Sequence, residues 1–251
     1  MLVAERQQKI IHLLKTEKMM TVEQLCKRLY SSGATIRRDL TSMSRAGQLK
    51  RIHGGAVLLD GTSTESPFLV RENEQYDVKL SLAKAACDSI QNGQTIFMDS
   101  SSTVLQMAKF LPSIEGLTVI TNGIKTAMQL APNSNIQTYC AGGKMRENSF
   151  SLTGVPTFEF FNHYNADIAF LSCRGFDFEK GVTEANEEEA QIKRVLVSRA
   201  KKVVLLCDNT KIGQTYLSRV CETAGIHLLV TNAIIEQTRS HHSIGIQVVT
   251  K

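Results

Sequence analysis

The chain lacks the residue patterns that support a metal centre, a disulfide framework or a membrane anchor. Its six cysteines are scattered through 251 residues without any Cys-x-x-Cys pair, which argues against a zinc site and against a disulfide-based fold. The six histidines show no ligand spacing. No apolar run approaches the roughly 20 residues of a membrane span, and the N-terminus has no apolar signal core. We therefore expect a cytoplasmic protein with reduced thiols, no metal or cofactor and no membrane contact.

Charge is distributed unevenly along the chain. The formal net charge is +5, but residues 1–58 hold 11 Lys and Arg against 4 Asp and Glu, which is +7, and the remainder holds 18 against 20, which is −2. A basic N-terminal module on a mildly acidic body is typical of binding to a polyanion through one end. An ordinary basic solvated surface is the alternative. The length and the 42% hydrophobic content suffice for one large domain, or for a small and a medium domain, each with its own core.

Residues 1–58 show the pattern of helices joined by a tight polar turn. Apolar residues at helical spacing predict a first helix over about residues 4–16. Thr21 followed by Gln24 has the form of a capping box and predicts the start of a second helix. Ser32 is a favourable N-cap for a third helix. The apolar side of that third helix consists of Ile36, Leu40 and Met43.

The opposite side of the third predicted helix carries Thr35, Arg37 and Arg38. In a helix-turn-helix, the second helix of the pair reads base edges with residues near its own N-terminus. An arginine can bind guanine or clamp a phosphate, and Ser32 at the helix start can help to receive a phosphate. Asp39 is expected to orient an arginine or cap locally rather than to contact DNA. An amphipathic helix with ordinary surface arginines fits the same residues.

Residues 48–58 predict a basic hairpin after that helix. The segment has strand character on both sides of Gly54-Gly55, which permits a tight turn. A two-stranded wing would carry basic side chains toward the DNA backbone or minor groove, and glycine there allows close approach to the duplex. The candidate DNA-contacting residues are therefore Thr21, Ser32, Thr35, Arg37, Arg38, Lys50, Arg51, His53, Gly54 and Gly55.

A linker is predicted over residues 59–70, which are rich in Gly, Ser and Thr, and a second domain over residues 71–251. In that domain short apolar runs alternate with helical segments, which predicts a parallel sheet covered on both faces. An α-helix is expected after the first run, ending near Leu111. The predicted strands are the runs at 96–98, 118–120, 136–140, 168–171, 203–206 and 227–230, with a final strand over 244–249. The fold class is therefore α/β, with an N-terminal winged helix-turn-helix.

Five of the predicted strand ends carry small polar, glycine or charged residues. Ligands of open parallel sheets bind outside the carboxyl ends of the strands, and hydroxyls at a helix N-terminus suit phosphate. The repetition at one edge predicts a pocket for a polyol phosphate. The residues concerned are Asp99, Ser100, Ser101, Ser102, Thr103, Thr121, Asn122, Gly142, Gly143, the Ser172-Cys173-Arg174-Gly175 run, Asp208 and Lys211. The acidic run over 184–189 is interpreted as a solvated helix start, with an acid–base carboxylate pair as the alternative.

The N-terminal motifs resemble the winged helix-turn-helix of the DeoR family of bacterial transcriptional regulators. The resemblance rests on Arg6, Ile10 and Leu14, on residues 35–40 (Thr-Ile-Arg-Arg-Asp-Leu) and on residues 51–56 (Arg-Ile-His-Gly-Gly-Ala). Ser31 and Gly33 differ from the residues usual there, which predicts a looser turn rather than a different fold. We expect a homodimer or homotetramer on double-stranded operator DNA, because a dimer would place two recognition helices about one DNA turn apart.

Residues 71–232 resemble the effector domain of the same family, which is similar to ribose-phosphate isomerase and CoA-transferase-like folds. The matching pieces are 99–103, 121–122, 142–143, 181–183, Asp208 and Lys211. The resemblance implies a phosphorylated sugar, with phosphate at Ser100, Ser102 and Thr103, sugar hydroxyls near Asp99, Thr121, Asn122 and Glu184, and Lys211 at an anionic or carbonyl end. Ser101 stands where the family has glycine, which predicts a narrower pocket, another ligand or weaker binding.

The expected function is that of a transcriptional repressor of a carbohydrate catabolic operon, relieved by a phosphorylated sugar, with no catalytic residues. Two alternatives stay open. One is a sugar-phosphate isomerase-like enzyme with a DNA-binding head, using Lys211 with Asp208 or Glu184 in proton transfer. The other is a DNA-binding protein whose pocket no longer senses a ligand.

Overall fold

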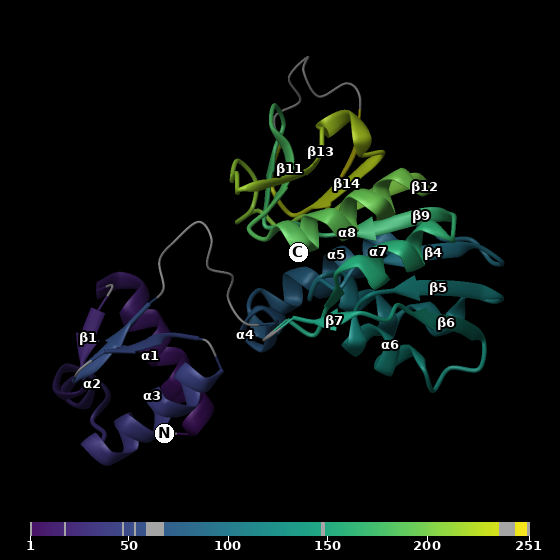
Figure 1. Ribbon diagram of the computed structural model, residues 1–251. Helices are drawn as coiled ribbons and strands as arrows, with labels where there is room; N and C mark the ends of the chain where they lie inside the picture. Colours follow the sequence, from purple (N-terminus) through teal and green to yellow (C-terminus); the bar gives the residue numbers. More distant parts are fainter. Residues whose placement is uncertain are drawn as a thin grey trace. The chain divides into compact units, whose positions relative to one another are not determined.

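The computed structural model describes residues 2–17, 19–46, 48–52, 54–58, 68–146, 149–235 and 244–249. The chain divides into two compact units, Met1–Val70 and Arg71–Lys251, and each is described by itself (Figure 1). The described residues include no helix long and apolar enough to cross a membrane. Most of the predicted linker lies outside the described residues, as do His53 and the side chain of Lys50.

The N-terminal unit consists of three helices and a small antiparallel sheet. Its helices are α1 (Val3–Glu17), α2 (Val22–Leu29) and α3 (Gly33–Arg45), and its strands are β1 (Met19–Thr21), β2 (Lys50–Ile52) and β3 (Gly55–Val57). Apolar side chains of all three helices meet in one core, formed by residues such as Ile10, Leu14, Leu25, Leu29, Ile36, Leu40 and Met43. The predicted helix-turn-helix is confirmed.

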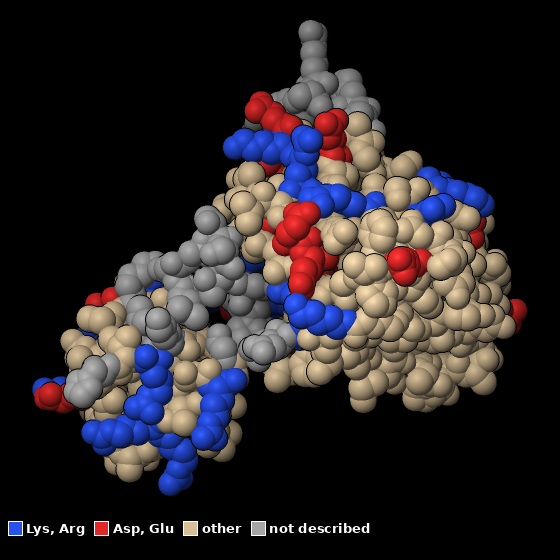
Figure 2. Space-filling view, in the orientation of Figure 1, with Lys and Arg blue, Asp and Glu red and all other residues tan. Residues whose placement is uncertain are grey.

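The wing has one strand more than the sequence predicts. The sheet order is β1-β3-β2, because β3 pairs with β1 as well as with β2. A strand of three residues is too short to show a period-2 pattern, so nothing in the sequence distinguishes it from the loop between two helices. On the face of this unit seen in Figure 2, Lys and Arg side chains gather with few Asp or Glu among them, as the charge of residues 1–58 leads one to expect.

The C-terminal unit is built on a seven-stranded sheet in the order β15-β14-β12-β9-β4-β5-β6. Every neighbouring pair is parallel, so the predicted parallel sheet is confirmed. The strands are β4 (Thr95–Met98), β5 (Leu117–Thr121), β6 (Ile136–Cys140), β9 (Ala166–Leu171), β12 (Ala200–Leu206), β14 (Leu228–Thr231) and β15 (Gly245–Val248).

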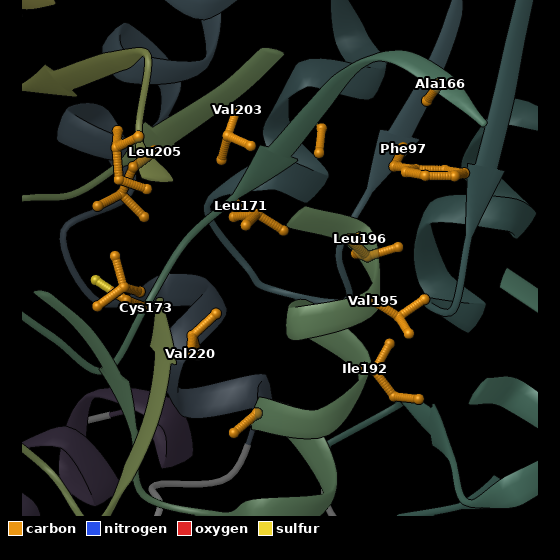
Figure 3. Packing of buried hydrophobic residues seen from close by; sticks show 14 of the residues in the cluster. Phe97, Ala166, Leu171, Cys173, Ile192, Val195, Leu196, Val203, Leu205 and Val220 are labelled. Atoms are coloured by element: carbon orange, nitrogen blue, oxygen red, sulfur yellow. The ribbon is translucent and has the colours of Figure 1, made fainter. Parts of the chain in front are cut away.

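Helices cover both faces of this sheet. Successive side chains of a strand point to opposite faces, so each strand contributes residues to both helix–sheet interfaces. Phe97, Leu171 and Leu205 pack on one face against α7 (Val155–Asn162) and α8 (Glu187–Ser198) (Figure 3). The residues beside them in the sequence pack on the other face, against α5 (Tyr76–Cys87), α6 (Ile124–Leu130) and a 3₁₀ helix; these are Ile96, Met98, Phe170, Val204 and Leu206. The strands therefore read as continuous apolar runs rather than as alternating ones.

Short elements complete the C-terminal unit. Helix α4 (Phe68–Asn73) begins three residues before this unit. Two small antiparallel sheets consist of β7 (Lys144–Met145) with β8 (Leu152–Thr153), and of β10 (Gly175–Asp177), β11 (Gly181–Glu184) and β13 (Ser218–Cys221). The 3₁₀ helices are η1 (Val104–Lys109), η2 (Leu111–Ser113) and η3 (Thr223–Gly225). The α-helix predicted after β4 is wrong in type, since η1 and η2 occupy its place. Over six residues the periods of 3.0 and 3.6 differ too little for the sequence to separate them.

Candidate functional site

The start of α3 presents a cationic face next to a well-formed cap. Ser32 is the N-cap, and its hydroxyl accepts a hydrogen bond from the Thr35 backbone N–H at 3.2 Å. Arg37 and Arg38 are exposed, whereas Thr35 is half-buried. Gly33 leaves room for one of these arginines, because a Cβ built there would lie 3.0 Å from Arg37 Nη1. Gly33 therefore leaves the cap at the start of the helix intact.

Asp39 faces the inside of the N-terminal unit rather than the surface. It is buried on α3 and accepts hydrogen bonds from the guanidinium of Arg6 on α1, one of them from Nη2 at 3.3 Å. A guanidinium that binds both carboxylate oxygens holds a fixed geometry. The pair therefore fixes α1 against α3, and Asp39 orients Arg6 rather than Arg37 or Arg38.

Thr21 serves as a helix cap. Its hydroxyl accepts the backbone N–H of Gln24 at 3.2 Å, and its own N–H donates to Gln24 Oε1 at 2.8 Å, which completes the predicted capping box.

Tyr30, which the sequence did not single out, is a further candidate for contact with DNA. It is 96% exposed in the turn between α2 and α3, with a left-handed φ of 48°. No local pattern marks it, because its exposure follows from that turn.

The wing approaches the rest of the N-terminal unit closely. Arg51 is exposed, and its Nη1 donates to the Thr41 hydroxyl of α3 at 2.9 Å, which joins β2 to α3. Gly54 has a φ of +74° at the hairpin tip. A Cβ on Gly55 would lie 2.3 Å from the backbone oxygen of Met20, so only glycine fits between β3 and β1.

The second candidate site lies where the strand order of the large sheet reverses. From β4 the chain adds β5 and β6 on one side, and β9, β12, β14 and β15 on the other. The reversal therefore falls between β4 and β9, and the crevice beyond the carboxyl ends at such a point is where ligands bind in open parallel sheets. Asp99 directly follows β4 and Ser172 directly follows β9. They meet there, since the backbone N–H of Ser172 donates to Asp99 Oδ2 at 2.9 Å.

Asp99 organises the loop that it begins, which we call the 99–103 loop. It is 1% exposed, and its Oδ1 accepts the backbone N–H of Ser101 at 2.9 Å. Its Oδ2 also lies 3.1 Å from Nζ of Lys193 on α8. The carboxylate is thus surrounded by protein donors, and the structure places it as a support for the loop.

The 99–103 loop gathers hydroxyl groups beside the loop that follows β5. A Cβ on Gly123 would lie 3.1 Å from Ser100 Cα, so these two loops touch. The Thr121 hydroxyl accepts the Gly123 backbone N–H at 3.0 Å. Among the described residues, the buried Thr103 Oγ1 and Asn122 Oδ1 have no hydrogen-bond partner. Buried polar atoms are usually paired, so these two atoms are exceptions within the fold.

Ser101 does not strain the loop in which it replaces glycine. Its φ is not positive, so the backbone does not require glycine. Its hydroxyl accepts the backbone N–H of Val104 at 3.2 Å, which holds the turn that leads into the following 3₁₀ helix. The serine therefore stabilises this turn.

Three lysines, Lys79, Lys193 and Lys211, lie near the crevice. Lys193 and Lys211 are paired with carboxylates. The first, Lys193, contacts Asp99 and Glu184, and its Nζ donates to the Ser172 carbonyl oxygen at 2.6 Å. Burial alone would lower the pKa of Lys193, but Asp99, Glu184 and Glu189 together raise it above its usual value. Lys193 is therefore a permanent cation that crosslinks α8 to the ends of β4, β9 and β11.

Lys211 and Asp208 form the second pair, after β12. Lys211 Nζ lies 3.2 Å from Asp208 Oδ2 and donates to the Ser172 hydroxyl at 3.2 Å. Burial disfavours charge on both groups, yet their attraction raises the pKa of Lys211 and lowers that of Asp208. The pair places an ammonium group at the same crevice as the 99–103 loop.

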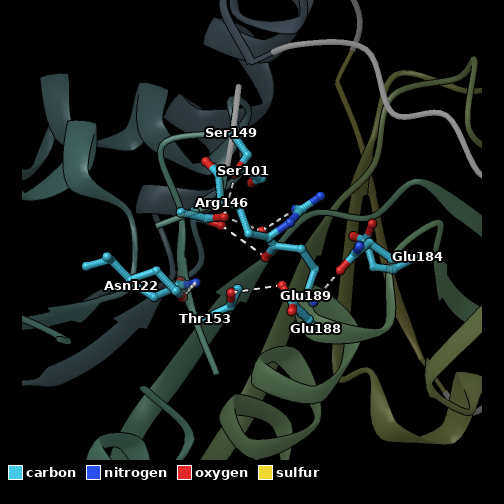
Figure 4. A network of polar contacts seen from close by, with 12 residues as sticks. Ser101, Asn122, Arg146, Ser149, Thr153, Glu184, Glu188 and Glu189 are labelled. Atoms are coloured by element: carbon cyan, nitrogen blue, oxygen red, sulfur yellow. Dashed lines mark hydrogen bonds and ion pairs between the residues drawn. The ribbon is translucent and has the colours of Figure 1, made fainter. Parts of the chain in front are cut away.

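Glu189 on the first turn of α8 connects the crevice to the β7–β8 region, as Figure 4 shows. It is buried, pairs with Arg146 Nη1 at 2.7 Å, and accepts hydrogen bonds from the hydroxyls of Ser100 and Ser151. Glu188 accepts a hydrogen bond from Thr153 at 3.2 Å. The interpretation of this run as a solvated helix start is therefore wrong for Glu189, because contacts distant in sequence enclose it.

Gly142 and Gly143 are exposed, and both lie against α7. The Gly142 carbonyl oxygen accepts the Thr157 hydroxyl at 2.7 Å, and a Cβ on Gly143 would lie 2.1 Å from that same hydroxyl. The structure thus brings together the predicted residues of the 99–103 loop, Ser172, Asp208 and Lys211, while these two glycines join α7 to β6.

In the described part of the chain, no three or more His, Cys, Asp or Glu side chains are arranged to hold a metal ion.

Both units match models of known families. Residues 6–62 match the DeoR-like helix-turn-helix domain, and residues 74–233 match the DeoR C terminal sensor domain. The chain belongs to the DeoR family. Its relatives include the HTH-type transcriptional regulator GolR of Listeria innocua, 40% identical over 91% of this chain and 90% of that one. Another is the HTH-type transcriptional repressor GlcR of Bacillus subtilis, 32% identical over 93% and 90%.

Among solved structures, a D-ribose-5-phosphate isomerase in complex with phospho-erythronic acid aligns with a TM-score of 0.42 and 14% identity, over 55% of this chain and 54% of that one. As a DeoR-family member, the chain is a DNA-binding transcriptional regulator.

Three buried charged side chains of this DeoR-family sensor unit escaped the sequence-based prediction: Lys79, Glu189 and Lys193. Each lies on a helix whose residues around it read as an ordinary amphipathic surface. Lys193 and Glu189 are four positions apart on α8, so they lie on one helical face, and that spacing is the only local signal.

Proposed function

We propose that this DeoR-family chain is a repressor whose affinity for operator DNA is lowered by a phosphorylated sugar bound at the crevice between β4 and β9. The observation that carries the proposal is the 99–103 loop at the topological switch point, where the ammonium group of Lys79 donates to the Ser102 hydroxyl and that of Lys211 to the Ser172 hydroxyl. That combination suits a compact dianion.

A polyol attached to that phosphate would find hydrogen-bond partners close by. Thr103 and Asn122 each keep a buried oxygen unpaired among the described residues. Glu184, which the family resemblance also implies near sugar hydroxyls, is bound to Lys193. We therefore assign hydroxyl recognition to Asn122 and Thr103 in preference to Glu184, and phosphate recognition to Ser100 and Ser102.

We assign DNA binding to α3 and the wing. Arg37 and Arg38 are exposed on the recognition helix, and Arg51 is exposed on β2. We propose that the chain acts as a homodimer or homotetramer, since two copies related by a two-fold axis place two recognition helices about one DNA turn apart. The named relatives are transcriptional regulators or repressors, which supports the assignment of a DNA-binding output.

We further propose that the pocket binds its ligand without turnover. A general base has to be available to the substrate, with a pKa suited to proton transfer. Asp99 and Glu184 are bound to Lys193, and Asp208 to Lys211. Incubating the chain with sugar phosphates and resolving the products by chromatography tests this point, and an isomerised or cleaved product would overturn it.

Thermal unfolding with a panel of pentose, hexose, amino-sugar and triose phosphates tests ligand recognition. A ligand at about 100 times its dissociation constant should add about 2.7 kcal/mol to the stability of the unit that binds it. We expect at least one phosphorylated sugar to raise the melting temperature and the same sugar without phosphate to leave it unchanged. If no phosphorylated compound shifts the transition, or the free sugar shifts it equally, the proposed phosphate site is wrong.

A further inference from the structure

Lys79 differs in its electrostatic surroundings from the other two lysines of the crevice. Lys193 contacts two carboxylates within 4.0 Å and Lys211 contacts one. Lys79 on α5 is 4% exposed, yet within the described residues its ammonium group has no carboxylate oxygen at ion-pair distance. An ammonium group held inside a protein without a counter-ion is unfavourable, so a neighbouring anion would stabilise it.

The two partners of Lys79 belong to the 99–103 loop and to α4. Its Nζ donates to the Ser102 hydroxyl at 3.2 Å and to the backbone carbonyl oxygen of Arg71. Arg71 lies on the last turn of α4. Both acceptors are uncharged, and one side chain therefore joins the loop assigned to phosphate with the end of that helix.

The charges that face Lys79 add up to an unfavourable field. Burial has the largest effect and lowers its pKa to about 8, and the nearby Lys211 and Arg71 act in the same direction. Asp208 and Glu74 act in the opposite direction without compensating. A phosphate dianion beside Ser102 would reverse the balance.

We propose that Lys79 transmits occupancy of the crevice to α4: a phosphate bound at the 99–103 loop takes the Lys79 ammonium as its counter-ion and weakens the hydrogen bond to the Arg71 carbonyl oxygen. The inference rests on the proposed function, because it needs a phosphate in that crevice. It adds a residue that receives the signal and a helix that carries it.

The physical basis is a competition between acceptors for one cation. Hydrogen bonds to a charged acceptor are roughly twice as strong as those to a neutral one, so a phosphate oxygen outcompetes a backbone carbonyl. Losing the Lys79 bond removes one donor from a carbonyl on the last turn of α4, which weakens the link between α5 and that helix end. In the sequence, α4 begins within the last three residues of the predicted linker, so a change in α4 reaches the segment that leads to the DNA-binding unit.

Inorganic phosphate is a suitable probe, because the inference concerns the phosphate subsite alone. Isothermal titration calorimetry at pH 7 and constant ionic strength would compare the full wild-type chain with Lys79→Gln. Lys84→Gln is the matched control, since Lys84 lies on the same helix and is exposed. We expect the dissociation constant for phosphate to rise at least tenfold in Lys79→Gln and to stay unchanged in Lys84→Gln.

Amide hydrogen exchange tests the transmission step. Adding phosphate to the wild-type chain should speed exchange in α4 and the residues directly after it, and this response should vanish in Lys79→Gln.

The pH profile gives a readout that needs no variant: phosphate affinity of the wild-type chain should fall as pH rises through about 8, where Lys79 loses its proton. The profile of Lys79→Gln should lack that step.

The possible failures point to different parts of the proposal. If phosphate does not bind the wild-type chain, the proposed pocket fails and this inference fails with it. If phosphate binds wild type and Lys79→Gln equally, or binding shows no step near pH 8, Lys79 is not the counter-ion although the pocket stands. If binding depends on Lys79 but exchange in α4 does not respond, the transmission to α4 is overturned.

Discussion

Replacing Arg37 and Arg38 together by alanine should weaken binding to an operator duplex by about 100-fold or more. An arginine that reads a base contributes ~1–3 kcal/mol, an arginine that holds a phosphate adds a salt-dependent gain, and both are exposed on the recognition helix. The duplex can be selected from a random library with the wild-type chain, and binding can be followed by fluorescence anisotropy. The matched control is Lys201→Ala with Lys202→Ala, which removes two exposed positive charges from the C-terminal unit.

The single variants separate the two roles. An arginine that reads a base should relax specificity at one position of the duplex when it is replaced. An arginine that holds a phosphate should weaken binding to all sequences equally and lower the salt dependence by about one ion. Operator affinity that survives the double replacement while the control is also unaffected would show that α3 is not the recognition helix.

Lys193→Met should destabilise the C-terminal unit by about 3–5 kcal/mol. Removing the ammonium takes away the cation that the buried Asp99 and Glu184 share, and breaking a buried ion pair by removing one partner is strongly unfavourable. The sequence has no tryptophan, so denaturant unfolding is best followed by far-ultraviolet circular dichroism. Lys201→Met is the control, because the ammonium of Lys201 pairs with Asp167 at the surface, where such pairs contribute about 0–1 kcal/mol.

A second substitution makes that test specific. Glu184→Gln added to Lys193→Met removes one of the two stranded charges and should restore part of the lost stability, since residues in contact do not act additively. A Lys193→Met chain as stable as wild type would mean that this ion cluster does not hold the crevice together.

The parallel sheet could be predicted from the sequence because most of its strands contain a continuous apolar run. Runs such as residues 168–171 are apolar at every position, which a strand buried on both faces requires. The residues at the strand ends follow from the same reasoning, since parallel strands bring their carboxyl ends to one edge. That reasoning puts Asp99 and Ser172, 73 positions apart, at the same edge of the sheet, and the two residues do meet.

What the sequence could not supply depends on contacts between distant segments. Lys79 lies on a helix beside Leu82 and Ala83, and no local pattern distinguishes a lysine that turns into a crevice from one that faces water. Glu189 has the local features of a solvated first turn, yet Ser100, 89 positions away, donates to its carboxylate. Strand β1 is three residues long, and a periodicity needs more.

The operator affinity of the full chain, measured with and without a phosphorylated sugar found by thermal unfolding, tests the central claim most directly. A ligand that favours the form unable to bind DNA should raise the dissociation constant for the operator by about 5- to 150-fold, which corresponds to a coupling of ~1–3 kcal/mol. The same sugar without phosphate should have no effect. An operator affinity that is unchanged or increased at saturating ligand would contradict a repressor relieved through this pocket.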